Sequence, residues 1–337
     1  MNQKSFLLLG GATALSLIAA GATLFGSGNA PAFAEAGEPL FPGLAEASAY
    51  VARLEVREGD FAITIESRDD VFVDAASGFP VDPEPLRDLV SGMTMATIAE
   101  AKTADPSRHA DLQLASIGAE EGAGSEIILL DGDGDTLAHV IAGQRDFTPG
   151  GVTGGQYVRR SDEDATWLVH ARLDPPSSRA GWFDTRLMEV DAIELTGATL
   201  TTEDGSVIAM SGADGTLTID PLLMTGRVPA ENQLNRIVRL FETLDFADVR
   251  AGMAIGSEAA GPSLKASLED GTTITLTQVS GSEGGDETRW FRINASGSTQ
   301  ISEELAATTT GFEFSMSSSD AEVFDWTLDD LTEETAS

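Results

Sequence analysis

Three aspartates at alternate positions are the residues most suited to metal chemistry in this sequence. Asp131, Asp133 and Asp135 lie in the stretch IILLDGDGDTLAHV and have the one-three-five spacing with which a calcium loop collects carboxylates. An EF-hand loop would continue with glycine at its sixth position and glutamate at its twelfth, where this chain has Thr136 and Ala142. The flanking residues are also typical of strands. The pattern therefore favours a turn of a β-hairpin, and weak calcium binding remains as the alternative.

Other residue types that support catalysis form no coherent set. His109, His139 and His170 show none of the spacings typical of metal ligands. Because the chain has 55 acidic residues, two of them close in sequence carry no information about acid–base catalysis. The sequence contains no nucleophile-elbow or phosphate-loop motif. We therefore predict no catalytic residue, no cofactor and no enzymatic activity, with a hydrolase whose carboxylates meet only in the fold as one alternative.

The charge and the lack of cysteine restrict the partners. The 337 residues carry a formal net charge of −35, and three of the 20 basic residues are lysines. Such a chain repels phosphate backbones and anionic headgroups, so we expect it to bind no nucleic acid. With no cysteine, disulfides, thiolate nucleophiles and a lipidated N-terminal cysteine are excluded.

The N-terminal segment has the features of an export signal. Lys4 precedes an uncharged run over residues 6–25, and a small-x-small pattern ends at Ala34. We predict that residues 1–34 are a signal peptide or an N-terminal membrane anchor, and cleavage after Ala34 is left open. The remainder is then periplasmic or otherwise extracytoplasmic, tethered to the inner membrane through residues 6–25 if the segment is retained.

Hydrophobic periodicity predicts the same series of elements twice. In the first half, alternation indicates strands around 54–56, 61–65 and 71–73, followed by a helix after Asp82 and then two hairpins. The second half repeats this order, with a helix over 231–246 and Trp290 in the place of Trp167. We also expect a short helix within 180–192, a strand over 312–316 and a helix that begins near Ser319.

These elements predict an α+β fold. It consists of two duplicated β-rich units, each with one amphipathic helix on a mainly antiparallel sheet, and a C-terminal strand and helix. The predicted boundaries are 39–182 for the first unit, 183–295 for the second and 296–337 for an acidic C-terminal segment.

Several short motifs in this order resemble a known bacterial family. They are LFPGL, VARLEV, GFPVDPEPLRDLVSGM, AEAKTADPSRHADLQL, LAHVIAG, YVRR, WLV and GWFDTRLMEVD. The chain resembles domain-of-unknown-function family 4340 over most of residues 40–191 and more loosely beyond. The resemblance implies an N-terminally anchored envelope protein, often encoded near ABC-type transport components of the kind linked to gliding motility. It implies no catalytic residue.

From these observations we expect a non-enzymatic extracytoplasmic accessory or scaffold module. Its expected partners are envelope or membrane proteins, such as subunits of an ABC-type transport system. A periplasmic protein that binds a small ligand or calcium is the alternative from another functional class, and it predicts a cleft and a thermal shift on adding the ligand.

Overall fold

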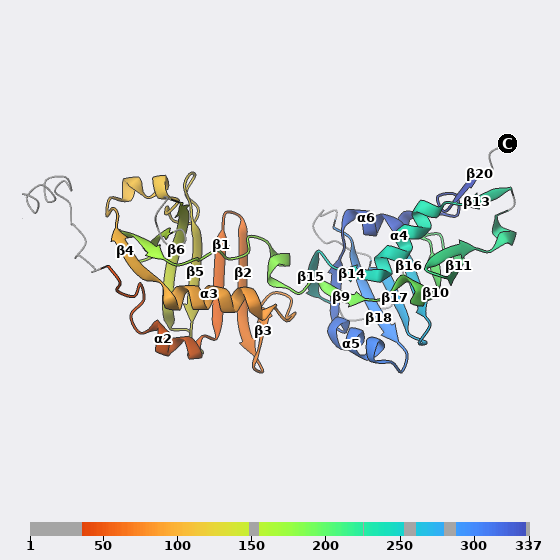
Figure 1. Ribbon diagram of the computed structural model, residues 1–337, viewed down its shortest axis with the longest axis horizontal. Helices are drawn as coiled ribbons and strands as arrows, with labels where there is room; N and C mark the ends of the chain where they lie inside the picture. Colours follow the sequence, from red (N-terminus) through yellow and green to blue (C-terminus); the bar gives the residue numbers. More distant parts are fainter. Residues whose placement is uncertain (1–35, 148–154, 225, 253–260, 280–287, 335–337) are drawn as a thin grey trace, which may run out of the picture. The chain divides into compact units, whose positions relative to one another are not determined.

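The computed structural model describes most of the chain. The described residues are 36–147, 155–224, 226–252, 261–279 and 288–334 (Figure 1). The predicted export segment, residues 1–34, lies outside them. No helix in these ranges is long and apolar enough to span a membrane. Contacts divide the chain into two compact units, of which the second combines Arg68–Asp82 with the described residues from Ser178 onward. The first unit holds the described residues before Arg68 together with Pro83–Ser177.

The first large sheet is antiparallel and has the order β3-β2-β1-β5-β6-β7-β8-β4. Its strands are β1 (Arg53–Glu58), β2 (Phe61–Arg68), β3 (Val71–Asp74), β4 (Thr97–Ala101), β5 (Ser125–Leu130), β6 (Thr136–Asp146), β7 (Gly155–Arg160) and β8 (Thr166–His170). The predicted alternation is confirmed, because Leu54 and Val56 are fully buried and pair with Ile65 and Ile63. One face of the sheet therefore forms the core of this unit.

Helix α3 (Pro83–Met95) covers that core face. It begins at Pro83, whose missing N–H costs nothing in the first turn, and it buries Leu86, Leu89 and Met93 along one stripe. Shorter helical segments complete the unit: α2 (Leu44–Ala47), η1 (Ser48–Tyr50), η2 (Pro106–Arg108) and η3 (Ala110–Leu112).

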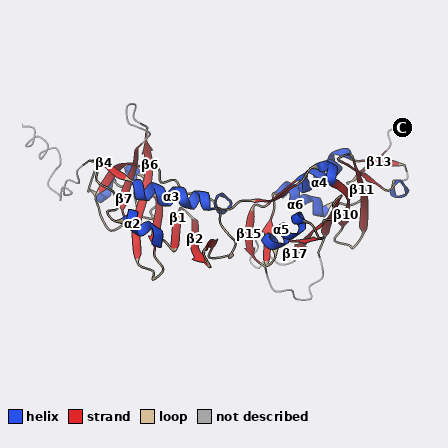
Figure 2. Cartoon of the chain, turned by 60° about the horizontal axis from the view of Figure 1, so that its bottom comes forward, coloured by secondary structure: helices blue, strands red, loops and turns tan. Residues whose placement is uncertain are grey.

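The second large sheet is also antiparallel and has the order β12-β11-β10-β16-β17-β18-β19-β15. Its strands are β10 (Leu195–Thr201), β11 (Val207–Ala213), β12 (Thr216–Ile219), β15 (Asp248–Ala251), β16 (Ser263–Leu268), β17 (Thr273–Val279), β18 (Trp290–Ser296) and β19 (Phe312–Ser315). Strands predominate in both units (Figure 2). The chain is thus an α+β protein with two large antiparallel sheets.

Helix α4 (Glu231–Glu242) packs on the second sheet with Leu234, Ile237 and Phe241 buried, as its sequence stripe predicts. Helix α5 (Gln300–Thr309) has Thr299 as its N-cap, and the side chains of Thr299 and Ser302 form a capping box. The smaller elements are η4 (Arg179–Trp182), β9 (Arg186–Glu189), η5 (Ala192–Glu194), η6 (Pro221–Leu223), β13 (Arg227–Pro229), β14 (Thr243–Asp245), α6 (Ser318–Ala321), η7 (Glu322–Asp325) and β20 (Thr332–Glu334).

The two sheets follow the same strand order when each is numbered from its own first strand. Two predicted details are wrong. Trp167 lies in β8, whose counterpart in the second sheet is β19, whereas Trp290 lies in β18, the counterpart of β7. The segment 296–337 is also not a separate piece, because β19 pairs with both β18 and β15 inside the second sheet.

The short helix predicted within 180–192 also differs from the structure. The chain forms η4 and then strand β9, which pairs with β14 through Glu189 and Thr243. The boundary predicted at residue 182 also differs from the structure, since residues 68–82 belong to the second unit. Phe79 explains this grouping, because its ring lies 5.0 to 5.7 Å from those of four phenylalanines of that unit: Phe183, Phe246, Phe312 and Phe314.

Candidate functional site

The three aspartates of the candidate calcium loop lie in the hairpin turn between β5 and β6. The carboxylate of Asp131 accepts the backbone N–H groups of Asp133, at 3.0 Å, and Asp135, at 2.9 Å. Gly134 has φ +87°, a conformation that glycine adopts without strain. The Asp131 side chain therefore caps the turn, which is the geometry of an Asx turn. In the described ranges, no group of three or more His, Asp and Glu side chains is arranged to hold a metal ion.

Each of the three histidines has different surroundings in the first unit. His139 Nε2 lies 3.0 Å from the carboxylate of Glu126, a residue of the adjacent strand β5. His109 is buried, and its Nε2 donates to the backbone carbonyl of Asp164 at 2.9 Å. His170 ends β8 and is exposed. The contacts of His109 and His139 tie together neighbouring parts of the first unit.

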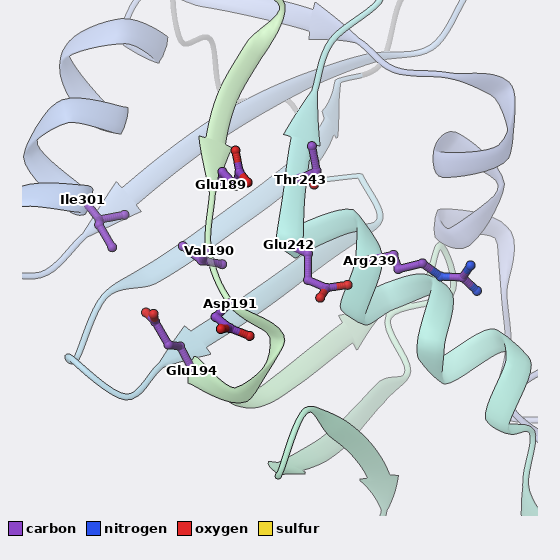
Figure 3. A pocket seen from close by; sticks show the side chains of 8 residues that line it. All are labelled: Glu189, Val190, Asp191, Glu194, Arg239, Glu242, Thr243 and Ile301. Atoms are coloured by element: carbon purple, nitrogen blue, oxygen red, sulfur yellow. The ribbon is translucent and has the colours of Figure 1, made fainter.

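A cavity in the second unit is lined mainly by charged residues. Its volume is about 740 Å³, and we call it the acidic cleft. The lining residues come from β9, η5, the end of α4, the start of β14 and the first turn of α5 (Figure 3). They are Glu189, Val190, Asp191, Glu194, Arg239, Glu242, Thr243 and Ile301.

Backbone pairing holds the cleft together. The N–H of Val190 donates to the carbonyl of Glu242 at 3.0 Å, which continues the β9–β14 ladder past Glu189 and Thr243. This pairing brings the end of α4 next to the residues that follow β9. The positions of the acidic side chains are therefore set by regular secondary structure on both sides.

The acidic side chains of the cleft differ in their partners. Glu189 forms an ion pair with Arg186 at 2.7 Å. Within the described part of the chain, the carboxylates of Asp191, Glu194 and Glu242 form neither a hydrogen bond nor an ion pair. Arg239 does not neutralise them, because its guanidinium points away from them and donates to its own helix backbone at 3.3 Å (Figure 3). The cleft can thus attract and hold a cationic group.

A second charged cluster fixes residues 68–82 in the same unit. Asp74 is 1% exposed and accepts hydrogen bonds from the N–H and hydroxyl of Ser77, at 2.8 and 2.6 Å. Arg179 donates to Asp74 at 3.0 Å and to Asp248 at 2.9 Å. Burial by itself raises the pKa of Asp74, but the hydrogen bonds from Ser77 and Arg179 outweigh it, so the pKa lies below that of a free aspartate.

Little in the sequence indicates the acidic cleft. Its unpaired carboxylates come from Asp191 and Glu194 on one segment and Glu242 on another, and no spacing links them. Among so many acidic residues, these three become distinct only when pairing of β9 with β14 is known. The one available signal was the end of the α4 stripe, which places Glu242 at a helix terminus.

The sequence of this chain matches the model of the family described as Domain of unknown function (DUF4340) over residues 72–264. This match covers more than half of the chain. The protein belongs to the DUF4340 family. No curated protein and no solved structure matches it.

The DUF4340 match includes both charged clusters. Asp74, Arg179 and Asp248 lie within it, as do the three unpaired acidic residues of the cleft. Ile301 of α5, which completes the lining, lies beyond its end. The acidic side chains of the cleft thus lie within the DUF4340 region, whereas the wall of the cleft formed by α5 lies outside it.

Proposed function

We propose that this DUF4340 protein is a non-enzymatic accessory or scaffold module that works outside the cytoplasm and binds a partner protein. The observation that carries the proposal is the acidic cleft, in which Asp191, Glu194 and Glu242 have no partner among the described residues. Lysine or arginine side chains of the partner would enter this cleft. Binding of such a protein partner would use the acidic cleft and would need no catalytic residues.

Electrostatics favours a cationic occupant. Each unit charge pair at 4 Å contributes about 4 kcal/mol at an effective dielectric constant of about 20, before desolvation is subtracted. Val190 and Ile301 add apolar surface to the lining, against which the methylene groups of a lysine or arginine side chain can pack. The net charge of −35 attracts a basic surface from a distance and speeds its encounter.

The proposed location rests on the N-terminal segment. Residues 6–25 are uncharged and 20 residues long, which suits an export signal or an anchor in the inner membrane. The resemblance to DUF4340 proteins supports a subunit of an ABC-type transport system as the partner. In this proposal the segment 6–25 keeps the module near the membrane, and the cleft selects the partner.

We further infer that the two units are duplicates of one ancestral unit. The common strand order of the two sheets supports this inference. The second unit differs by α5, which stands between β18 and β19, where the first sheet has a short turn between β7 and β8. Because α5 supplies Ile301 to the cleft, the inserted helix would have adapted one of the two units for binding.

A pull-down of the tagged full-length protein from its native membranes tests the proposal. The cleft variant D191N/E194Q/E242Q removes three charges, and the control variant E303Q/E333Q/E334Q removes three exposed charges from the same unit. We expect membrane proteins to co-purify with the wild type and the control, and their recovery with the cleft variant to fall about tenfold, which corresponds to 1.4 kcal/mol. Equal recovery with the cleft variant, or no partner with the wild type, would refute the proposal.

A further inference from the structure

A buried glutamate in the second sheet holds two arginines side by side. Glu313 of β19 is completely buried. Its Oε2 atom accepts from Nε and Nη2 of Arg250 at 3.0 and 2.8 Å, and its Oε1 atom accepts from Nη2 of Arg292 at 2.6 Å. Arg250 comes from the neighbouring strand β15 and Arg292 from β18, so three adjacent strands contribute one side chain each.

The cluster has more positive charge and more donors than Glu313 uses. Two guanidinium groups share one carboxylate, which leaves a net charge of +1. A guanidinium has five N–H donors, and Nη1 of Arg250 and both Nε and Nη1 of Arg292 have no hydrogen-bond acceptor among the described residues. The side chains of Arg250 and Arg292 are 29% and 30% exposed, so both arginines are in contact with solvent.

The arginines are also held in place. The guanidinium of Arg250 lies over the ring of Trp290, 4.4 Å from its centroid. Together with the two bonds to Glu313, this contact fixes the plane of Arg250. A guanidinium with a fixed plane loses little conformational entropy when it binds an oxyanion through two parallel hydrogen bonds.

On this face of the sheet, the described residues of β16, β17 and β18 include no carboxylate that competes for the two arginines. Strands β16, β17 and β18 bury alternate residues against the core, so the intervening residues lie on the opposite face with Arg292. These residues are Ser263, Lys265, Ser267, Thr273, Thr275, Thr277, Val279, Trp290, Asn294 and Ser296. They include one further cation and no acid. Asp248, two residues before Arg250, is already paired with Arg179.

We propose that Arg250 and Arg292 form a binding site for the oxyanion of a ligand that carries a carboxylate or phosphate group. Glu313 positions both guanidinium groups, Trp290 fixes Arg250, and Lys265 and the hydroxyl groups of β17 extend the site along the sheet. This site is separate from the acidic cleft and has the opposite charge, so it adds a second ligand to the proposed function. A chain with a net charge of −35 can bind an anion where its acidic residues are excluded.

Titration calorimetry of the full-length protein with inorganic phosphate, and separately with succinate, tests this site at constant ionic strength. We expect saturable binding of at least one probe, and the probe that binds more tightly distinguishes phosphate from carboxylate chemistry. R292Q should weaken binding at least tenfold. The control R227Q, which alters an arginine paired with Asp329 in the same unit, should leave binding unchanged.

R292K keeps the charge but loses the planar fork, and it serves as the second variant if R292Q does not fold. We expect it to weaken binding to an intermediate degree while circular dichroism stays that of the wild type. The proposal is overturned if neither probe binds the wild type saturably, or if R292Q and R292K bind the probes as tightly as the wild type does. In that case the two arginines serve only to neutralise Glu313.

Discussion

At the scale of single residues, the partners of an acidic side chain decide its role. Asp131 caps a turn, Asp74 and Glu313 are buried beside arginines, and Asp191 and Glu242 line a cleft without partners. The sequence allowed the first of these roles to be predicted, because a turn is a local structure. The others depend on residues more than 60 positions away or on pairing between strands, and no local pattern contains that information.

We expect Asp74→Asn to reduce the free energy of unfolding by about 3 kcal/mol at pH 7, because it leaves the partly buried Arg179 with a weaker partner. Urea unfolding measures this change. Asp248→Asn is the matched control, since its side chain is 35% exposed and the expected loss is below about 1 kcal/mol. Equal losses for the two variants would contradict the role assigned to Asp74.

The pH dependence of the same pair follows from the lowered pKa of Asp74. A carboxyl group whose pKa is lower in the folded than in the unfolded state stabilises the fold above the unfolded pKa. That contribution is lost as the pH falls through the folded pKa. The difference in unfolding free energy between the wild type and D74N should therefore be largest at neutral pH and shrink in acid, and a difference independent of pH would contradict it.

At the scale of elements, local signals predicted the two amphipathic helices α3 and α4 and most strands of the two sheets, but not β4 or β15. They did not predict elements whose conformation depends on pairing with residues distant in sequence. The residues of β9 have helix-like apolar spacing, but they form a strand because they pair with β14 in an antiparallel ladder. Helix α5 was not predicted because Ile301 and Leu305 are its only large apolar residues, so its stripe is weak, and its main signal is the capping pair Thr299 and Ser302.

The segment 68–82 gives a prediction at this scale. Phe79 is 4% exposed within a cluster of phenylalanine rings. Phe79→Ala should reduce the free energy of unfolding of the second unit by about 3–5 kcal/mol, since it removes the ring and leaves a cavity. Chemical denaturation followed by tryptophan fluorescence measures the loss. Phe147→Ala, at a side chain 76% exposed, should change it by less than about 0.5 kcal/mol. Similar effects of the two changes would rule out the packing role of Phe79.

At the scale of the whole molecule, the second unit is built from two separated stretches of sequence. The predicted boundaries at residues 182 and 295 place elements that are neighbours in sequence in the same unit. The docking of 68–82 depends on Phe79 and Asp74, whose partners lie about 100 residues or more further along the chain. The limits of the two compact units therefore differ from the predicted boundaries.

This organisation predicts the behaviour of fragments. A fragment of residues 178–337 should unfold at a lower temperature than the second unit does in the full chain, because it lacks the ring of Phe79 and the carboxylate of Asp74. Adding a synthetic peptide of residues 68–82 should raise the melting temperature, and a peptide with F79A and D74N should not. Differential scanning fluorimetry measures these shifts. A fragment as stable as the full-length unit, unaffected by the peptide, would contradict the two-segment unit.

The central claim is that the acidic cleft binds a cationic surface of a partner protein. The most direct test places a photoreactive amino acid at Thr243, within the cleft, in the tagged full-length protein in its native membranes. Irradiation should yield an adduct with one membrane protein through a peptide containing lysine or arginine, and the cleft variant D191N/E194Q/E242Q should abolish it. The same probe at the exposed Thr216 should give no such adduct. The account is contradicted if the probe at Thr243 captures no protein, or if its adduct persists in the cleft variant.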